Sequence, residues 1–387
     1  MSPSRQRETV HGAMGRRMWE ERMISRRQVA GFLGVTALGM PLVGRGAGAQ
    51  TPPGLADPVS REALQPLVEG AKKEGSLTYW DTIIQPDSND ELAAAFRKHY
   101  GLPGSFRVNY SVAGSLALIT RVEQEISANR VTIDVAAVGT PSWCFQKAQE
   151  GAFLAYDAPE YAHYGRSFDM GLGLRPYFAF NGAYIFTPMW NADALKFNGR
   201  SWQDLIGSVP AGRFGYSDVS QSAAHLAAYT MMRRILPAEY FRKIAEMKPF
   251  FANRSQQVTD RLISGQDLIN FAGQPNRAWQ YNQKGVNLKV YYPEEGVPLI
   301  PQQMFILKAA PHPNAAKLWL NFVLSEEGQS IIAKREILSS GRDGFASPYP
   351  EYAPPIDQVK VIPIDWKSVS AADLDKAKQE WISIFNP

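Results

Sequence analysis

The stretch from Gly75 to Gly151 constrains the fold of this chain more than any other. Three times within it, a short β-prone run passes through small or helix-capping residues into a helical pattern. The β-prone runs span 77–80, 106–112 and 133–139, and the helical patterns that follow them span 91–98, 116–126 and 143–150. Strands that alternate with helices at this spacing must pair in parallel, because only a crossover helix returns the chain to the same end of the sheet. We therefore predict a mostly parallel sheet flanked by helices.

The strands of a parallel sheet end at one edge, and open α/β sheets bind ligands at that edge. Helix N-termini there present unpaired N–H groups and the positive ends of helix dipoles. Thr140 followed by Pro141 is a strong helix start, since Thr is a preferred N-cap and Pro suits the first helical position. The stretch therefore predicts one ligand-binding half, which needs a second half to close on it.

The later part of the chain repeats this order of strand, cap and helix. A β-prone run at 212–217 is followed by capping residues and by a helical pattern at 223–236. The aromatic, β-prone run from Tyr177 to Phe186 is expected to cross into this second half. The run at 297–307 is expected to be the return crossing.

The first 49 residues have the features of an export signal. Arg26 and Arg27 precede an apolar run at 29–43, and Ala47-Gly48-Ala49 forms a cleavage site of small residues. The apolar run is too short to span a bilayer comfortably. The paired arginines resemble the twin-arginine signal, which exports folded proteins, and an ordinary signal peptide that contains two arginines is the alternative. We expect a periplasmic product.

Charge and cysteine content narrow the function. The chain of 387 residues has a net charge of +4, but the eight Arg and three Glu of residues 1–49 leave about −1 for the rest. Nothing in the mature chain therefore favours nucleic acid as a partner. Cys144 is the one cysteine, which rules out an intrachain disulfide and a cysteine-rich metal site.

The chain departs from the enzyme motifs that it approaches. Gly215–Val219 is close to G-x-S-x-G, but Val219 replaces the last glycine. Gly171-Leu172-Gly173 does not continue into a dinucleotide fingerprint. The five histidines are scattered without metal-ligand spacing, and we interpret His225 as a helix-face residue rather than a base. We therefore expect no catalysis, no metal and no cofactor.

Six short motifs lie in order along most of the mature chain. They are Glu74–Tyr79, Gly114-Ser115, Ile133–Val135, Gly151–Tyr156, Tyr291–Pro298 and Leu324–Gln329. In this order they resemble the extracellular solute-binding proteins of bacterial ABC importers, in the branch of iron(III), thiamine, polyamine and phosphonate binders. The resemblance implies the type II periplasmic-binding-protein fold, in which two hinged α/β lobes close around a solute and deliver it to a permease without catalysis.

The expected domain organisation follows from the chain order and the resemblance. It comprises a signal peptide (1–49), a tether (50–59), lobe 1 (60–176 with 290–336) and lobe 2 (177–289 with 337–387). Each lobe is expected to be a mostly parallel sheet flanked by helices, and a two-segment hinge joins them. The expected partners are a small-molecule solute and the cognate permease in the inner membrane, and the chain is expected to be a monomer.

The candidate ligand-binding residues lie next to strand ends and helix starts in both halves. They are Trp80, Asp81, Gly114, Ser115, Thr140, Trp143, Tyr184, Ser217, Asp218, Ser220 and Arg277. Gly114 is expected to allow close backbone approach to the solute and a positive φ. Asp218 either faces the cleft or caps its helix. Arg277, in an expected hinge-side loop, could pair with an anionic solute.

These candidates predict an anionic or zwitterionic solute. The iron binders of the family use two adjacent tyrosines after the strand that corresponds to the one ending at Phe271, and residues 272–281 lack that pair. Direct coordination of iron(III) is therefore disfavoured, because a hard cation requires several oxygen ligands. A cofactor-containing exported enzyme and a receptor that signals through a membrane partner remain alternatives.

Hinge closure is the first testable prediction. Two lobes joined by crossing segments should rotate towards each other around the solute. Small-angle scattering should give a smaller radius of gyration for the solute-bound protein than for the free protein. An unchanged radius, with binding verified by calorimetry on the same sample, would contradict closure.

Overall fold

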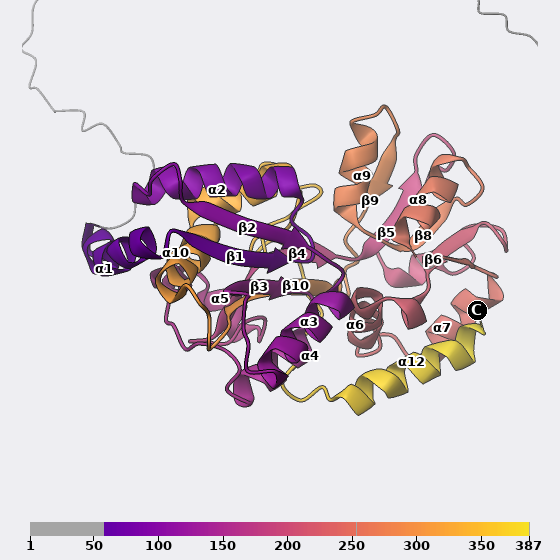
Figure 1. The fold of residues 1–387 in the computed structure, drawn as a ribbon. Helices are drawn as coiled ribbons and strands as arrows, with labels where there is room; N and C mark the ends of the chain where they lie inside the picture. Colours follow the sequence, from indigo (N-terminus) through magenta and orange to yellow (C-terminus); the bar gives the residue numbers. More distant parts are fainter. Residues whose placement is uncertain (1–57, 253, 387) are drawn as a thin grey trace, which may run out of the picture. The chain divides into compact units, whose positions relative to one another are not determined.

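The computed structural model describes residues 58–252 and 254–386, which belong to one compact unit (Figure 1). The predicted signal peptide and nearly all of the predicted tether lie outside the described residues. The described chain forms two five-stranded sheets with helices packed on them. This arrangement confirms the predicted α/β class.

The first sheet contains the three predicted β-prone runs. Its strands, in spatial order, are β2 (Arg107–Val112), β1 (Ser76–Asp81), β3 (Val135–Val138), β10 (Leu299–Ile306) and β4 (Phe178–Ile185). β1 pairs in parallel with β2 and β3, as predicted, whereas β10 is antiparallel to both β3 and β4. The associated helices are α1 (Pro58–Glu74), α2 (Pro86–Tyr100), α3 (Ser115–Ser127), α4 (Pro141–Gln149), α5 (Gly165–Asp169), α10 (Pro313–Leu324) and α11 (Glu326–Arg335).

The second sheet has the same mixed character. Its strands, in spatial order, are β7 (Phe250–Ala252), β6 (Phe214–Ser217), β8 (Ile269–Gly273), β5 (Thr187–Asn191) and β9 (Leu288–Val290). β6 is parallel to β7 and β8, and β5 is antiparallel to β8 and β9. Its helices are α6 (Ala223–Met232), α7 (Ala238–Glu246), α8 (Ser255–Ile263), α9 (Pro275–Asn282) and α12 (Ala371–Phe385), and the short 3₁₀ helices of the chain are η1 (Pro159–His163), η2 (Trp202–Leu205) and η3 (Val219–Gln221).

The chain passes between the sheets at three places. The run from Tyr177 to Phe186, expected to be a crossing, forms β4 in the first sheet, and the crossing itself is Phe186, between β4 and β5. The run at 297–307, expected to be the return crossing, instead forms β10 within the first sheet, and residues 291–298 return the chain to it from β9. A third passage leads from α11 to α12, which packs against α6 and α7. The segment from α11 to α12 is thus a third connection between the sheets, beside the two that were expected to form the hinge. The lobe boundaries stay a prediction.

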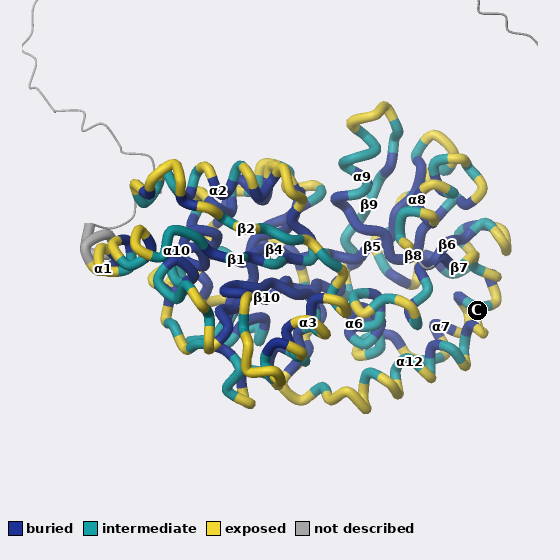
Figure 2. The backbone as a smooth tube through the Cα atoms, in the orientation of Figure 1, coloured by how far each residue is buried: buried dark blue, intermediate teal, exposed yellow. Residues whose placement is uncertain are grey.

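Two large apolar clusters stabilise the unit, and strands β3, β6, β8 and β10 are buried along their whole length (Figure 2). One lies where α1, α2 and α10 cover the first sheet, and Trp319 there packs edge-on against Tyr79 and Phe96. The other includes the opposite face of the first sheet and much of the second, where Tyr216 packs 4.6 Å from Phe271. Side chains this large account for much of the buried apolar area that stabilises a fold.

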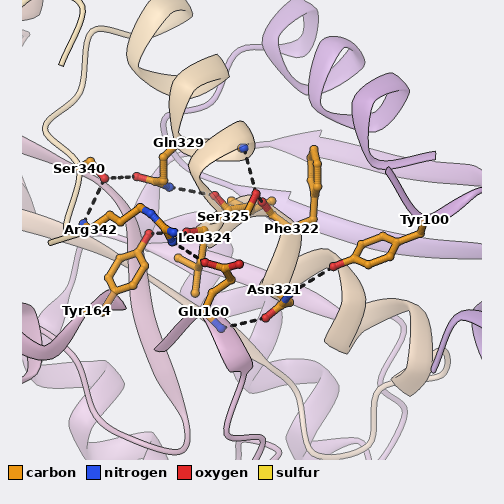
Figure 3. Close-up of polar contacts among 12 residues, drawn as sticks. Tyr100, Glu160, Tyr164, Asn321, Phe322, Leu324, Ser325, Gln329, Ser340 and Arg342 are labelled. Carbon is orange, nitrogen blue, oxygen red and sulfur yellow. Dashed lines mark hydrogen bonds and ion pairs between the residues drawn. The ribbon is translucent and has the colours of Figure 1, made fainter. Parts of the chain in front are cut away.

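The Leu324–Gln329 motif forms the corner between α10 and α11 (Figure 3). The Ser325 hydroxyl accepts a hydrogen bond from the Gly328 amide at 3.2 Å, so Ser325 is the N-cap of α11. Gln329 Nε2 donates to the carbonyls of Val323 (2.9 Å) and Asn181 (3.1 Å). Carbonyls at a helix end lack partners within the helix. Gln329 therefore provides a hydrogen-bond donor for a carbonyl at the end of α10 and also connects this corner to Asn181 on β4.

Polar side chains from distant segments complete this corner (Figure 3). Ser340 Oγ donates to Gln329 Oε1 at 2.6 Å, and Tyr164 donates to the Leu324 carbonyl at 3.0 Å. Arg342 forms an ion pair with Glu160 on η1. The corner is therefore cross-linked to η1 and to the segment after α11 by hydrogen bonds in a largely buried environment.

Gly328→Ala tests how tightly this corner is packed. Alanine is the better helix former by about 1 kcal/mol, so on a free helix surface the substitution would stabilise the protein. Here a Cβ would lie 2.3 Å from the Phe322 carbonyl oxygen and 2.7 Å from that of Val323. We expect urea unfolding to show a loss of about 1–3 kcal/mol.

Gly104→Ala is the matched control, because a Cβ there meets nothing within 4 Å. Its free energy of unfolding should change by less than about 0.5 kcal/mol. A Gly328→Ala protein as stable as the control would show that the corner has room for a methyl group.

Candidate functional site

The candidate residues lie at the carboxyl ends of parallel strands in both sheets. β1, β2 and β3 end at Asp81, Val112 and Val138, and their parallel pairing places these ends at one edge. β6 and β8 are likewise parallel and end at Ser217 and Gly273. The structure therefore places the candidates at the two sheet edges that the sequence predicted.

The Asp81 side chain is fully buried, and both of its carboxylate oxygens accept hydrogen bonds from other groups of the protein. Its Oδ1 accepts from the amides of Ile83 (2.6 Å) and Ile84 (2.9 Å). Its Oδ2 accepts from Asn181 Nδ2 at 2.8 Å and from the Tyr79 hydroxyl. Burial raises the pKa of the Asp81 carboxyl, and these hydrogen bonds oppose that rise. Asp81 thus fixes the loop after β1, and a direct contact with solute stays a prediction.

The three aromatic candidates differ in their surroundings. Trp143 donates from Nε1 to Glu123 at 2.9 Å and packs against Phe153 and Phe305, so its ring is engaged within the first half. Trp80 is half-buried beside the same apolar cluster. Tyr184, on β4, is flanked by both large clusters. Of the three, Trp143 has the most complete internal packing.

The helix starts of the first half differ in detail from the expectation. Gly114 is the N-cap of α3 with φ −65° and ψ 148°, so the expected positive φ is wrong. Ser115 is the first residue of α3, and no side chain caps this helix. Thr140 is the N-cap of α4, but its hydroxyl makes no cap hydrogen bond and is buried without a partner. The N–H groups at the starts of both helices therefore lack a side-chain acceptor.

The second-half turn after β6 contains one capping residue and one unpaired hydroxyl. Asp218 accepts from the Ser220 amide (2.8 Å) and the Ser220 hydroxyl (2.6 Å), which is the capping alternative of the two interpretations. The Ser217 hydroxyl is buried and has no partner in the protein. Ser217 is therefore the residue of this turn that has hydrogen-bonding capacity left for a solute.

Arg277 lies in the first turn of α9, so the expected loop is wrong and a helix takes its place. Among the described residues, its side chain donates only to Gln280 Oε1 (3.0 Å), and its Nε is buried without a partner. The helix could have been predicted, because Pro275 gives the same start signal as Pro141.

Glu336 and Asn276 are two polar residues of this region that the sequence did not indicate. Burial raises the pKa of Glu336, whose Oε1 accepts from the Gln85 amide at 2.7 Å. Burial also raises the pKa of Tyr184, and the Arg277 guanidinium lowers the pKa of both groups. The Arg277 guanidinium on α9 therefore influences the pKa values of one group on β4 and one at the end of α11. The Asn276 Oδ1 is buried and unpartnered.

His225 is buried on α6 next to the Phe186 crossing. Its Nδ1 lies 2.9 Å from Ser222 Oγ, its Nε2 lies 3.4 Å from Ser255 Oγ, and its ring packs edge-on against Phe186 at 4.8 Å. Burial lowers its pKa from 6.5 to about 4. His225 is therefore neutral in the folded protein at neutral pH and connects the starts of α6 and α8.

Within 58–252 and 254–386, no group of three or more His, Cys, Asp or Glu side chains could hold a metal ion. No helix in the same ranges has the length and apolar character of a membrane span.

The His225 pKa predicts a pH dependence of stability. The unfolded chain binds a proton near pH 6.5 and the folded protein near pH 4, so acidification between these values favours unfolding. The loss attributable to His225 should approach about 3 kcal/mol. Chemical unfolding of wild type and His225→Gln across this range should show a shallower dependence in the variant.

His163→Gln, at an exposed histidine, is the control and should retain the wild-type slope. Equal slopes for His225→Gln and wild type would mean that folding does not change the pKa of His225.

Comparison with known proteins supports this arrangement. The model of the family "bacterial extracellular solute-binding protein" matches residues 87–335. The comparison with curated proteins gives no match.

Solved structures of periplasmic binding proteins share the fold. Iron-bound HitA from Pseudomonas aeruginosa is 18% identical, covers 80% of this chain and 99% of its own, and has a TM-score of 0.63. AfuA from Actinobacillus pleuropneumoniae with fructose-6-phosphate is 18% identical, with 80% and 98% covered and a TM-score of 0.65. The spermidine/putrescine protein PotD from Streptococcus pneumoniae is 15% identical, with 80% and 98% covered and a TM-score of 0.63. Because the family model matches more than half of the chain, this protein belongs to the bacterial extracellular solute-binding proteins.

Proposed function

We propose that this protein captures a small anionic or zwitterionic solute between its two sheet edges, without catalysis. In this proposal it is the substrate-binding component of an ABC transporter. It acts as a monomer in the periplasm, after twin-arginine export, and delivers the solute to a permease in the inner membrane. The features of residues 1–49 support the export route, and family membership supports the transport role.

The observation that carries the proposal is the incomplete bonding of Arg277. A partly buried arginine ordinarily has a carboxylate partner, because a desolvated charge without one is costly. The Arg277 side chain donates only to the neutral Gln280 within the described structure, and its Nε is unpartnered. A planar guanidinium suits a carboxylate, sulfonate or phosphonate group, to which it can donate two parallel hydrogen bonds.

The neighbouring unpartnered groups support the same class of solute. The Ser217 hydroxyl can donate to an anion. The Asn276 Oδ1 is an acceptor, which suits an ammonium or hydroxyl group on the same solute. A zwitterion or a hydroxy acid would use all three side chains.

The ligands of the structural relatives do not decide between these classes. HitA was solved with iron and AfuA with fructose-6-phosphate, and PotD is the substrate-binding protein of a spermidine/putrescine ABC transporter. Arg277 favours the anion among these, since a cation beside it would be repelled. The missing pair of adjacent tyrosines at 272–281 argues against direct iron coordination.

Two other functions are separable by experiment. A cofactor-containing exported enzyme should show visible absorbance from flavin, haem or an iron–sulfur centre after purification. A signalling receptor should bind its solute equally well but should be dispensable for solute uptake by cells. Native mass spectrometry of the freshly purified protein should identify a co-purifying solute directly.

Arg277→Gln tests the proposed anion contact. A hydrogen bond to a charged group contributes about 1.5–3 kcal/mol, so affinity for anionic solutes should fall about ten- to a hundredfold. The measurement is calorimetry with the carboxylates, sulfonates or phosphonates that stabilise the wild type in a thermal-shift panel.

Arg107→Gln is the matched control, because exposed Arg107 begins β2 at the opposite edge of the first sheet. It should bind as the wild type does. Selective stabilisation of the wild type by spermidine-like cations, with no anion bound, would overturn the anion proposal.

A further inference from the structure

Gln302 is a buried residue of β10 whose amide lies against the carboxyl end of β3. It is 2% exposed, and the next residue, Gln303, pairs with Val138, the last residue of β3. A Cβ on Gly139, which follows β3, would lie 2.2 Å from Gln302 Nε2 and 3.1 Å from Gln302 Cδ. The amide therefore occupies the space that a side chain at position 139 would need, directly before the start of α4.

Only one end of the Gln302 amide is used within the described protein. Its Oε1 accepts a hydrogen bond from the hydroxyl of Thr82, the residue after β1, at 2.5 Å. No acceptor for its Nε2 is present among residues 58–252 and 254–386. The neighbouring Gln303 amide, by contrast, has the carbonyls of Pro301 (3.0 Å) and Val138 (3.1 Å) as acceptors. Native proteins satisfy most buried polar groups, so the free Nε2 of Gln302 is a donor available to a ligand.

The strand pairing is irregular opposite Gln302. Pro301 is in register with Ala183 of β4. Gln303, two residues further along β10, is in register with Phe180, three residues back along β4. Two residues of β4 therefore stand opposite Gln302, which is the arrangement of a β-bulge. Bulges redirect side chains and are common next to functional sites.

The start of α4 supplies further donors next to Gly139. Thr140 is the N-cap of α4, but its hydroxyl makes no cap hydrogen bond and is buried without a partner. The first backbone hydrogen bond of α4 runs from the Cys144 amide to the Thr140 carbonyl at 3.2 Å. The N–H groups of Ser142 and Trp143 precede it, so they have no acceptor within the helix. These donors lie at the positive end of the α4 dipole.

We propose that the start of α4 is an oxyanion subsite, in which the Gln302 amide, the Thr140 hydroxyl and the first N–H groups of α4 hold an acid group of the solute. A helix start suits an anion because its free N–H groups point at the ligand and the dipole favours negative charge. The subsite deepens the proposed function, on which it rests, by adding acid-binding donors at the first sheet edge to Arg277 on α9.

The signals of the donors themselves test the subsite with simple probes. Acetate, methanesulfonate and methylphosphonate each carry one acid group, and acetamide is the neutral analogue of acetate. In nuclear magnetic resonance titrations of the isotope-labelled protein, the acids should shift the signals of the Gln302 side-chain amide and the Ser142 N–H. Acetamide should shift both signals less at the same concentration, because it lacks the charge that the dipole favours. The Gln302 signal is assigned by its absence in Gln302→Glu.

Gln302→Glu and Thr140→Val each remove one donor. Gln302→Glu keeps the acceptor for Thr82 and replaces the donor by a charged oxygen, so calorimetry should give about ten- to a hundredfold weaker binding of methylphosphonate. Thr140→Val should weaken it about three- to tenfold. Because the Thr140 hydroxyl is buried without a partner, Thr140→Val should unfold at the same urea concentration as the wild type or at a higher one. A purely structural role would instead lower that concentration.

Gln146→Glu and Thr230→Val are the matched controls. Gln146 is exposed on α4, so Gln146→Glu adds the same charge to the same helix away from its start. The Thr230 hydroxyl donates to the Leu226 carbonyl within α6 at 2.8 Å. Both variants should bind methylphosphonate within about twofold of the wild type, since neither removes a donor at the start of α4.

The outcomes separate the subsite from the proposed function. Binding that is lost in Arg277→Gln but unchanged in Gln302→Glu and Thr140→Val, with no shift of the Gln302 signal, would overturn the subsite and leave the proposed function intact. The reverse pattern would support the subsite and contradict the Arg277 contact. Equal shifts with acetamide and acetate would overturn the subsite as an acid-binding group. Failure of every acid to bind would overturn both.

Discussion

The buried carboxylate of Asp81 is the contact on which the geometry of the first sheet edge depends. A desolvated carboxylate is costly unless its oxygens are satisfied, and four internal donors do so here. Two of the donors are the amides of Ile83 and Ile84, so the turn after β1 is fixed to the strand itself. Asn181 extends the connection to β4 and, through its carbonyl, to Gln329 on α11. These contacts therefore link β1, β4 and α11, which are far apart in the sequence.

At the carboxyl ends of the strands in the second sheet, several buried polar groups lack hydrogen-bond partners. Ser217, Asn276 and Arg277 each retain a buried polar atom without a partner. Native proteins satisfy most buried polar groups, and these three unpartnered atoms are the ones on which the proposed solute contact rests. The first edge also has an unpartnered buried group, the Thr140 hydroxyl, so hydrogen-bonding capacity is left at both edges.

The sequence predicted the local elements of the first sheet because each has its own signal. Parallel pairing followed from spacing, and the start of α4 followed from Thr140 and Pro141. The central position of β10 could not be predicted, since its pairing partner β3 is about 170 residues earlier and nothing local encodes that choice. The same limit applies to Glu336, which accepts from Gln85 across 251 residues. The sequence does contain a signal for the helix at Arg277, because Pro275 is a favoured first helical residue.

β10 is translated after all of the other described strands, although it lies inside the first sheet. β10 lies between β3 and β4, yet it is synthesised only after every strand of the second sheet. A nascent chain that stops before residue 299 lacks the middle of its first sheet, with β3 and β4 left as unpaired edges that invite association. Long-range pairings of this kind also form slowly. Completion of the first sheet must therefore follow translation of most of the chain, and a ribosome-bound intermediate would depend on chaperones until β10 emerges.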